Sequence, residues 1–147
     1  MTQGAVVRFK RTRKEAILPA KAHSGDAGFD LFAAEAAYIR PGRTYLVSIG
    51  FDVALPMGYV GFVCSRSGLA AKDEVFVLNA PGVVDSGYRG PLKVILRNAG
   101  SASFYVDKGD RIGQLVVQKT YPVAAVEVAE FEDDTERGTG GFGSSGK

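Results

Sequence analysis

The sequence lacks tryptophan and has one cysteine, Cys64, and one histidine, His23, among 147 residues. A single cysteine excludes an internal disulfide framework and any zinc site built from several cysteines. Because Cys64 lies in an apolar run, we expect a small buried thiol. A Ser-His-Asp triad would have to use His23, so the sequence gives little basis for histidine chemistry.

Long hydrophobic runs are also missing, since no apolar stretch approaches the roughly 18 residues that span a bilayer. The N-terminal segment carries five basic residues between Arg8 and Lys14, with no apolar stretch behind them. We therefore expect no signal peptide, no membrane attachment and a cytoplasmic protein.

Charge is unevenly distributed along the chain. Residues 1–126 carry 16 basic and 10 acidic residues, whereas residues 127–147 carry 2 basic and 6 acidic ones. The basic body favours anionic ligands. The cluster at residues 8–14 could be a solvated edge strand or a nucleic-acid arm; edge strands are the commoner case, and we expect no stable nucleic-acid binding.

Glycine is abundant, with 19 residues, and turn signals separate short β-rich apolar runs. These runs cover residues 5–9, 38–39, 44–53, 59–64, 75–78, 92–96, 104–106, 112–117 and 123–128. Their spacing is typical of an all-β sandwich or barrel. Leu92, Val94 and Leu96 should share the buried face of one strand. The only predicted helix covers residues 67–72, with Ser67 as its N-cap.

The chain divides by composition into a β-rich body, residues 1–129, and a flexible glycine-rich arm, residues 130–147. Five glycines lie between Gly138 and Gly146, but Arg137 and Phe142 are unusual in a plain linker. The segment from Gly141 to Lys147 approaches the P-loop spacing, but it lacks the required preceding strand and following helix. Its N–H groups and serine hydroxyls could still bind phosphate oxygens.

Two further segments combine polar side chains with glycine turns. Arg66 and Ser67 at a predicted helix start could bind an anion, or could form an ordinary capped turn. The segment from Asp85 to Tyr88 predicts a hairpin that places a carboxylate beside an aromatic ring. Such a carboxylate could act as a general base and the ring could pack on a sugar, although Asp-Ser-Gly is also a common turn.

Together and in order, five segments resemble the motifs of the trimeric dUTP pyrophosphatase (dUTPase) family. They are Ala27-Gly-Phe-Asp-Leu31, Arg66-Ser-Gly-Leu-Ala70, Gly82-Val-Val-Asp-Ser-Gly-Tyr-Arg-Gly90, Gly109-Asp-Arg-Ile-Gly-Gln114 and Arg137-Gly-Thr-Gly-Gly-Phe-Gly-Ser-Ser-Gly146. The resemblance implies that the body, residues 1–129, is an all-β, jelly-roll-like β-barrel domain, assembled as a homotrimer with swapped or shared C-terminal segments. It also implies hydrolysis of dUTP to dUMP and pyrophosphate by attack of water on the α-phosphorus, which lowers dUTP and supplies dUMP for dTTP synthesis.

By this resemblance, Asp85 is the catalytic base and Tyr88 stacks under the deoxyribose. Asn79 and the backbone of Gly82, Val83, Val84 and Asp85 should recognise the uracil edge, since unpaired polar groups discriminate strongly against cytosine. Lys93 should border the sugar or a phosphate.

The same resemblance assigns the phosphate chain to Arg66, Ser67, Gly68 and Gln114. Arg137 should reach the γ-phosphate, Phe142 should cover the uracil ring, and Gly143, Ser144 and Ser145 should bind phosphate oxygens. Asp30 is expected near Mg²⁺ through its waters, because Mg²⁺ on a triphosphate keeps several waters.

Two positions depart from the usual motifs. Ser65 stands where the family commonly has proline, and Ser145 where threonine is commoner. We expect Ser65 to loosen a fixed φ and shift Arg66 slightly, and Ser145 to have little effect.

Two other functions are compatible with this fold. A dCTP deaminase would need a different catalytic set containing a glutamate in place of the Asp85 turn. A nucleotide-responsive regulatory protein would keep Arg66, Tyr88 and Phe142 to bind the nucleotide and would not need to hydrolyse it.

Overall fold

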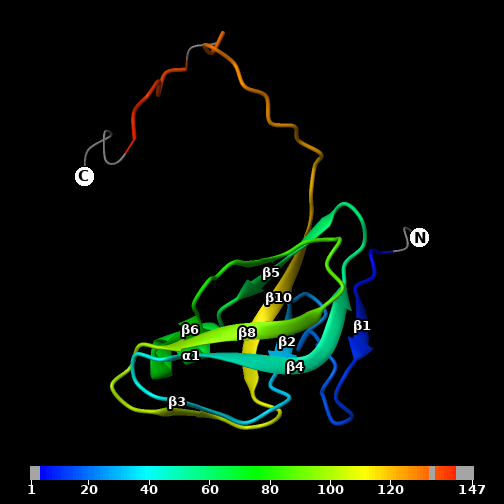
Figure 1. The fold of residues 1–147 in the computed structure, drawn as a ribbon, viewed down its shortest axis with the longest axis vertical. Helices are drawn as coiled ribbons and strands as arrows, with labels where there is room; N and C mark the ends of the chain where they lie inside the picture. Colours follow the sequence, from blue (N-terminus) through cyan, green and yellow to red (C-terminus); the bar gives the residue numbers. More distant parts are fainter. Residues whose placement is uncertain (1–3, 133–134, 142–147) are drawn as a thin grey trace.

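The computed structural model describes residues 4–132 and 135–141, and its body consists of antiparallel β-sheets with a short helix (Figure 1). The elements are β1 (Arg8–Arg11), β2 (Gly28–Phe32), β3 (Ala37–Ile39), β4 (Thr44–Ala54), β5 (Tyr59–Cys64), α1 (Ser67–Asp73), β6 (Val75–Val77), β7 (Gly82–Val84), β8 (Pro91–Asn98), β9 (Phe104–Val106) and β10 (Arg111–Lys119). The all-β prediction is confirmed. The described part of the chain contains no helix with the length and hydrophobicity needed to cross a bilayer.

Two four-stranded sheets supply most of the core. One has the strand order β1-β4-β8-β6 and the other β2-β10-β5-β7, while β3 and β9 form a separate pair. Strands that follow one another in sequence often lie in different sheets, which is the connectivity of jelly-roll-like folds.

Strand β8 shows why these residues form a two-layer structure. Leu92, Val94 and Leu96 are buried as predicted, and the intervening Lys93 is exposed. Leu31 of β2 and Leu115 of β10 are fully buried in the same core from the other sheet. This alternation fixes which face of each sheet points outward, because a one-residue slip would exchange the two faces.

The N-terminal strand lies further along the chain than predicted. Residues 5–7 lie outside it, and β1 pairs with β4 from Arg8↔Ala54 to Arg11↔Phe51. The ring of Phe9 packs edge-on against Phe51, which places the strand in this register.

Among the residues that the structure describes, three of the five basic residues at 8–14 have partners. Lys10 pairs with Asp52 at 3.7 Å, and Arg13 pairs with Glu35 at 2.9 Å. The Arg11 guanidinium lies over the Phe51 ring and donates to the Ala16 carbonyl. These contacts favour the edge-strand interpretation over a nucleic-acid arm.

The predicted strand at residues 123–128 is wrong for the single chain. Residues 120–132 lie outside every strand and are exposed, and Figure 1 shows this segment leaving the body beyond β10. Val123 is 91% exposed. The segment has strand-forming residues but no neighbouring strand among the described residues, and isolated strands are not stable in water.

The cysteine prediction needs a correction too. Cys64 is half-buried rather than buried, and its thiol donates to the Phe62 carbonyl at 3.6 Å. Its position at the end of β5, on the face opposite the core residue Val63, explains the partial exposure.

Candidate active site

A row of three residues crosses the outward face of the second sheet. Asp30 of β2 pairs with Gln114 of β10, and Gln114 pairs with Cys64 of β5. Since the next residue of β10, Leu115, is fully buried, these three side chains lie on the opposite, outward face. The chain then continues from Cys64 through Ser65 to Arg66, which brings two predicted phosphate-binding residues and Asp30 together.

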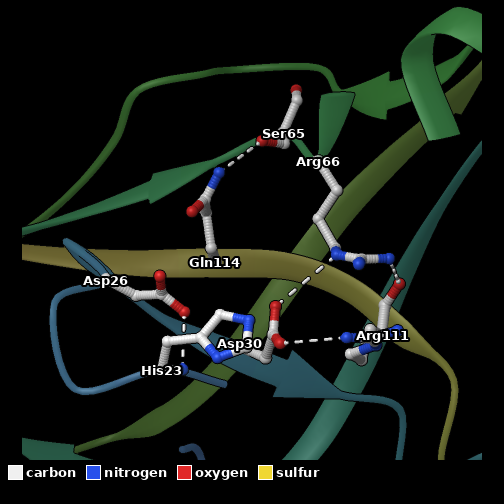
Figure 2. A network of polar contacts seen from close by, with 7 residues as sticks. All are labelled: His23, Asp26, Asp30, Ser65, Arg66, Arg111 and Gln114. Carbon is white, nitrogen blue, oxygen red and sulfur yellow. Dashed lines mark hydrogen bonds and ion pairs between the residues drawn. The ribbon is translucent and has the colours of Figure 1, made fainter. Parts of the chain in front are cut away.

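Asp30 lies between two guanidinium groups (Figure 2). Its Oδ1 is 3.5 Å from Arg66 Nε and its Oδ2 is 3.5 Å from Arg111 Nη1. Arg66 also donates to the Arg111 carbonyl at 3.2 Å. Charge-assisted contacts of this kind orient the planar guanidinium and leave its other N–H groups available to an anion.

The Gln114 amide is held by one hydrogen bond and packs beside a glycine. Its Nε2 donates to the Ser65 carbonyl at 3.0 Å, as Figure 2 shows. Its Oε1 lies against Gly28, where an added Cβ would approach it to 2.5 Å. The small Gly28 therefore leaves room for this orientation of the amide.

Helix α1 begins directly after Arg66. The N-cap is Arg66, in an extended conformation and without a side-chain cap, so the prediction that Ser67 caps the helix is wrong. Because Ser67 is already the first helical residue, its side chain lies in the first turn, and both Ser67 and Gly68 are exposed beside Arg66.

A pocket of about 360 Å³ collects seven other predicted residues. They are Asn79, Gly82, Val83, Val84, Asp85, Tyr88 and Lys93. Leu46 and Ile95, which form a cross-strand pair on β4 and β8, add an apolar wall that the sequence analysis missed. The pocket combines apolar surface with a few polar groups, as small-molecule sites do.

The turn that carries Asp85 and Tyr88 differs from the predicted hairpin. The Tyr88 N–H donates to the Asp85 carbonyl at 3.1 Å, which closes a β-turn. However, β7 pairs with β5, and β8 pairs with β4 and β6, so the flanking strands belong to different sheets. Since β8 lies between β4 and β6 in the first sheet and β7 lies beside β5 in the second, the turn crosses from one sheet to the other.

Tyr88 and Asn79 both pack closely against glycines. The Tyr88 hydroxyl donates to the Pro91 carbonyl at 2.9 Å, and a Cβ on Gly90 would lie 2.6 Å from that hydroxyl. The Asn79 amide lies over Gly82, where a Cβ would approach its Nδ2 to 2.9 Å. Both glycines thus allow a polar side chain to fold back over the backbone.

The two groups of residues are separated within one chain. Asp85 stands one residue beyond the Gly61↔Val84 pair, whereas Gln114 pairs with Cys64. Four residues along β5 and two strand spacings give a Cα separation of about 16 Å between Asp85 and Gln114. Within the described residues, none of those lining the pocket belongs to the Asp30 network.

The arm is described only in part. Arg137 lies on an exposed turn, where its Nε donates to the Gly140 carbonyl at 2.9 Å. Phe142, Gly143, Ser144 and Ser145, which the sequence assigns to the substrate, lie outside the described residues.

Arg111 was missed as a site residue. It belongs to the motif from Gly109 to Gln114, and its place three residues before Gln114 was the available signal. It lines a second pocket, of about 290 Å³, together with Arg66 and Asp110. The Asp30 network therefore contains two guanidinium groups rather than one.

Comparison with known proteins decides the family. Residues 14–146 match the sequence model of the family dUTPase. The chain belongs to the dUTPase family. A deoxyuridine 5'-triphosphate nucleotidohydrolase of Corynebacterium glutamicum is 48% identical, over 100% of this chain and 99% of the relative. A protein of the same name from Clostridium kluyveri is 47% identical over 93% of this chain and 95% of the relative.

Solved dUTPase structures have the same fold. The dUTPase of Staphylococcus bacteriophage 80alpha with dUpNHpp matches with a TM-score of 0.90 and 31% identity, over 97% of this chain and 99% of the other. A mutant dUTPase of phage phi11 of S. aureus, described with a structural Mg(II) ion, matches with a TM-score of 0.81 and 25% identity, over 87% and 99%. These matches confirm the jelly-roll-like fold expected from the motifs.

Proposed function

We propose that this chain hydrolyses dUTP to dUMP and pyrophosphate, which lowers dUTP and supplies dUMP for dTTP synthesis. The observation that carries the proposal is the pocket that unites Asp85, Tyr88, Asn79 and Lys93 in a member of the dUTPase family. The separate group around Arg66 and Gln114 provides the cationic and amide donors that a triphosphate needs.

Asp85 is the base in this proposal. Its exposed carboxylate accepts a hydrogen bond from a water and takes a proton as that water attacks the α-phosphorus. The bond from the α-phosphorus to the bridging oxygen breaks, and pyrophosphate leaves with the electron pair. Positioning and electrostatic stabilisation supply most of the catalysis in reactions of this class.

Tyr88 and Asn79 provide selectivity. The Tyr88 ring packs under the deoxyribose and leaves no room for a 2′-hydroxyl, while Asn79 and the backbone of Gly82 to Asp85 pair with the uracil edge. Close approach of the turn excludes the methyl group of thymine. A cytosine would leave fixed polar groups unpaired, which costs more than a poor apolar fit.

The phosphates are bound by Arg66, Ser67, Gly68 and Gln114, with Lys93 at the sugar or a phosphate. Arg66 is the strongest donor, because Asp30 and the Arg111 carbonyl orient its guanidinium. The exposed N–H groups and the hydroxyl at the start of α1 add neutral donors.

Each active site draws on more than one copy of the chain in a homotrimer. The separation of about 16 Å between the Cα atoms of Asp85 and Gln114 supports this, because the pocket and the Asp30 network share no residue within the described chain. The exposed apolar segment at residues 120–132 supports it as well, since contact with a neighbouring copy would bury those side chains.

The proposed division is a β-barrel domain at residues 1–129 and an arm at residues 130–147 that closes a neighbouring site. In this arrangement Arg137 reaches the γ-phosphate, Phe142 covers the uracil, and Gly143, Ser144 and Ser145 bind phosphate oxygens. Closure over bound substrate would exclude water from side reactions.

The surroundings of Asp30 suit contact with the waters of a Mg²⁺ ion bound to the triphosphate, and they do not suit a Mg²⁺ ion coordinated directly by protein side chains. Both of its carboxylate oxygens face guanidinium groups at 3.5 Å, and the described residues contain no cluster of three potential metal-ligating side chains. A single carboxylate suits contact through the metal's waters. Mg²⁺ would neutralise phosphate charge, and Asp30 would orient the ion's hydration shell.

Assays with purified protein, Mg²⁺ and either dUTP, dCTP or dTTP test the function. We expect dUMP and pyrophosphate from dUTP alone. Single-turnover hydrolysis in H₂¹⁸O should place the label in dUMP, because water attacks the α-phosphorus. Ammonia from dCTP would instead indicate a deaminase, and binding of dUTP without turnover would indicate a regulatory protein.

Asp85→Asn tests the assigned base. The variant should bind dUpNHpp as wild type does but lose kcat by more than about 100-fold, because an amide cannot accept the proton. The neighbouring Ser86→Ala variant keeps the carboxylate and serves as the matched control. An unchanged kcat in Asp85→Asn would move the base to another residue.

A further inference from the structure

We propose that Ser65 is a positioning residue that orients both Arg66 and Gln114 by connecting their loop to the edge strand β6. This inference rests on the proposed function of those two residues as phosphate ligands. The hydroxyl of Ser65 accepts a hydrogen bond from the Val77 N–H at 2.9 Å, and its carbonyl accepts one from Gln114 at 3.0 Å.

The hydrogen-bond pattern of β6 explains why Val77 needs this acceptor. Leu78 N–H donates to the Ile95 carbonyl, and Ala99 N–H donates to the Glu74 carbonyl. Hydrogen-bonded and non-hydrogen-bonded pairs alternate in an antiparallel ladder, so the Val77↔Leu96 pair between them is of the second kind. The Val77 N–H therefore points away from β8, toward the free edge of the sheet.

Burial makes this donor costly to leave unpaired. Val77 is 1% exposed, so water has little access to its backbone. Ser65 Oγ is its acceptor among the described residues, whereas the Val77 carbonyl is satisfied by the Ala80 N–H at 3.1 Å. A residue without a hydroxyl at position 65 would leave a buried N–H unsatisfied.

The position of Ser65 affects the site residues in two ways. Its carbonyl orients the Gln114 amide directly, as Figure 2 shows. Arg66 is the next residue and the N-cap of α1, so the backbone at Ser65 sets where its guanidinium meets Asp30. A residue other than proline at position 65 is expected to loosen the backbone φ there. The hydrogen bond of the Ser65 hydroxyl, which proline could not make, offsets this loosening.

The test compares Ser65→Ala with Ser65→Thr, which keeps the hydroxyl. Ser103→Ala is the matched control, because this variant also loses one hydroxyl hydrogen bond, between Ser103 and Tyr38 at 2.9 Å, and neither residue is assigned to the substrate. The readouts are KM and kcat for dUTP, the Kd of dUpNHpp, and hydrogen exchange of the Val77 amide.

For Ser65→Ala we expect KM and the dUpNHpp Kd to rise about 3- to 10-fold, the range of one hydrogen bond, with kcat within about 2-fold. A contact to phosphate that is made equally in the ground state and the transition state raises KM and Kd without changing kcat when it is weakened. The Val77 amide should exchange faster in Ser65→Ala, and Ser65→Thr should restore both readouts. Ser103→Ala should change neither.

Equal behaviour of Ser65→Ala and Ser103→Ala would overturn the role of Ser65, as would faster Val77 exchange with unchanged KM and Kd. If wild-type protein does not hydrolyse dUTP, the proposed function fails. The Ser65 proposal is then judged on dUpNHpp binding and Val77 exchange, which need no turnover, and it fails if wild-type protein does not bind the analogue.

Discussion

Tyr88 shows how closely a side chain of the candidate pocket depends on its own turn. Its ring crosses Gly90 and its hydroxyl bonds to the carbonyl of Pro91, so the orientation is set within three residues. A Cβ at Gly90 would meet the ring at 2.7 Å and the hydroxyl oxygen at 2.6 Å, closer than real side chains approach.

Gly90→Ala should therefore displace Tyr88 and raise KM for dUTP about 10-fold, because the sugar loses its packing surface. Gly87→Ala is the control on the same turn, since an added Cβ there meets no atom within 4 Å. Steady-state kinetics of the two variants check this. Equal KM values would show that Tyr88 does not contact the sugar.

The residue types of the candidate site could be predicted from the sequence, but the contacts between site residues that are distant in the sequence could not. Asp85 and Tyr88 stand in one continuous segment, so sequence order alone places them together. The ion pair of Asp30 with Arg111 and the bond of Ser65 to Val77 join residues that are distant in the sequence. No local periodicity encodes such contacts, which depend on how the sheets pack.

Among the elements, the strand with a clear alternation was predicted, whereas the hairpin pairing predicted for the short strand before Asp85 was wrong. Leu92, Val94 and Leu96 define β8 through a period of two. Strand β7 has only three residues, Gly82–Val84, and its pairing with β5 follows from the free edge of the second sheet rather than from its own pattern. The segment 123–128 has strand composition, but it pairs with no strand in the part of the chain that the structure describes.

Glu35 connects the segment after β2 to the middle of β4. Its carboxylate accepts a hydrogen bond from the Ser48 N–H at 3.0 Å and pairs with Arg13 at 2.9 Å. The Ser48 N–H, followed by the Arg13 guanidinium, outweighs partial burial and lowers the pKa of Glu35 below its ordinary 4.5. The ionised Glu35 carboxylate therefore stabilises the fold fully above pH 4.5, and this contribution is lost as the pH falls through the lower pKa of the folded state.

Glu35→Gln should cost about 1 kcal/mol of unfolding free energy at pH 7, a modest value because the pair is partly exposed. The difference between variant and wild type should shrink as pH falls below 4.5. Urea denaturation at several pH values measures it. A difference that stays constant between pH 7 and pH 3 would assign the effect to packing rather than to the carboxylate.

For the whole molecule, the separation of Asp85 from the Arg66 network predicts that copies of the chain complement one another. Asp85→Asn and Arg66→Ala chains should each be nearly inactive. When they are unfolded together in equal amounts and refolded, about a quarter of the sites in a closed ring should combine an intact Asp85 with an intact Arg66.

Activity of the refolded mixture, compared with each variant refolded alone, is the measurement. Mixing Asp85→Asn with Asp85→Asn/Arg66→Ala is the control, because no intact site can form. A mixture as inactive as its components would show that a single chain supplies both residues.

The arm makes only local contacts where it is described. Its hydrogen bonds join residues 135 to 140 with one another. Deleting residues 137–147 should therefore leave thermal stability and assembly unchanged, while kcat/KM for dUTP falls at least about 10-fold through loss of closure. Calorimetry, light scattering and kinetics check this, and an unfolded truncation would make the arm structural.

The row of Asp30, Gln114 and Cys64 also gives the molecule a chemical reporter. Cys64 is the chain's single thiol, and it lies one strand spacing from Gln114, about 4.8 Å across the sheet, on the same outward face. A thiol reagent would therefore attach one label at one known position without any engineered cysteine. Its reaction rate, followed with and without nucleotide, would report occupancy of the surface beside Gln114 in the unaltered protein.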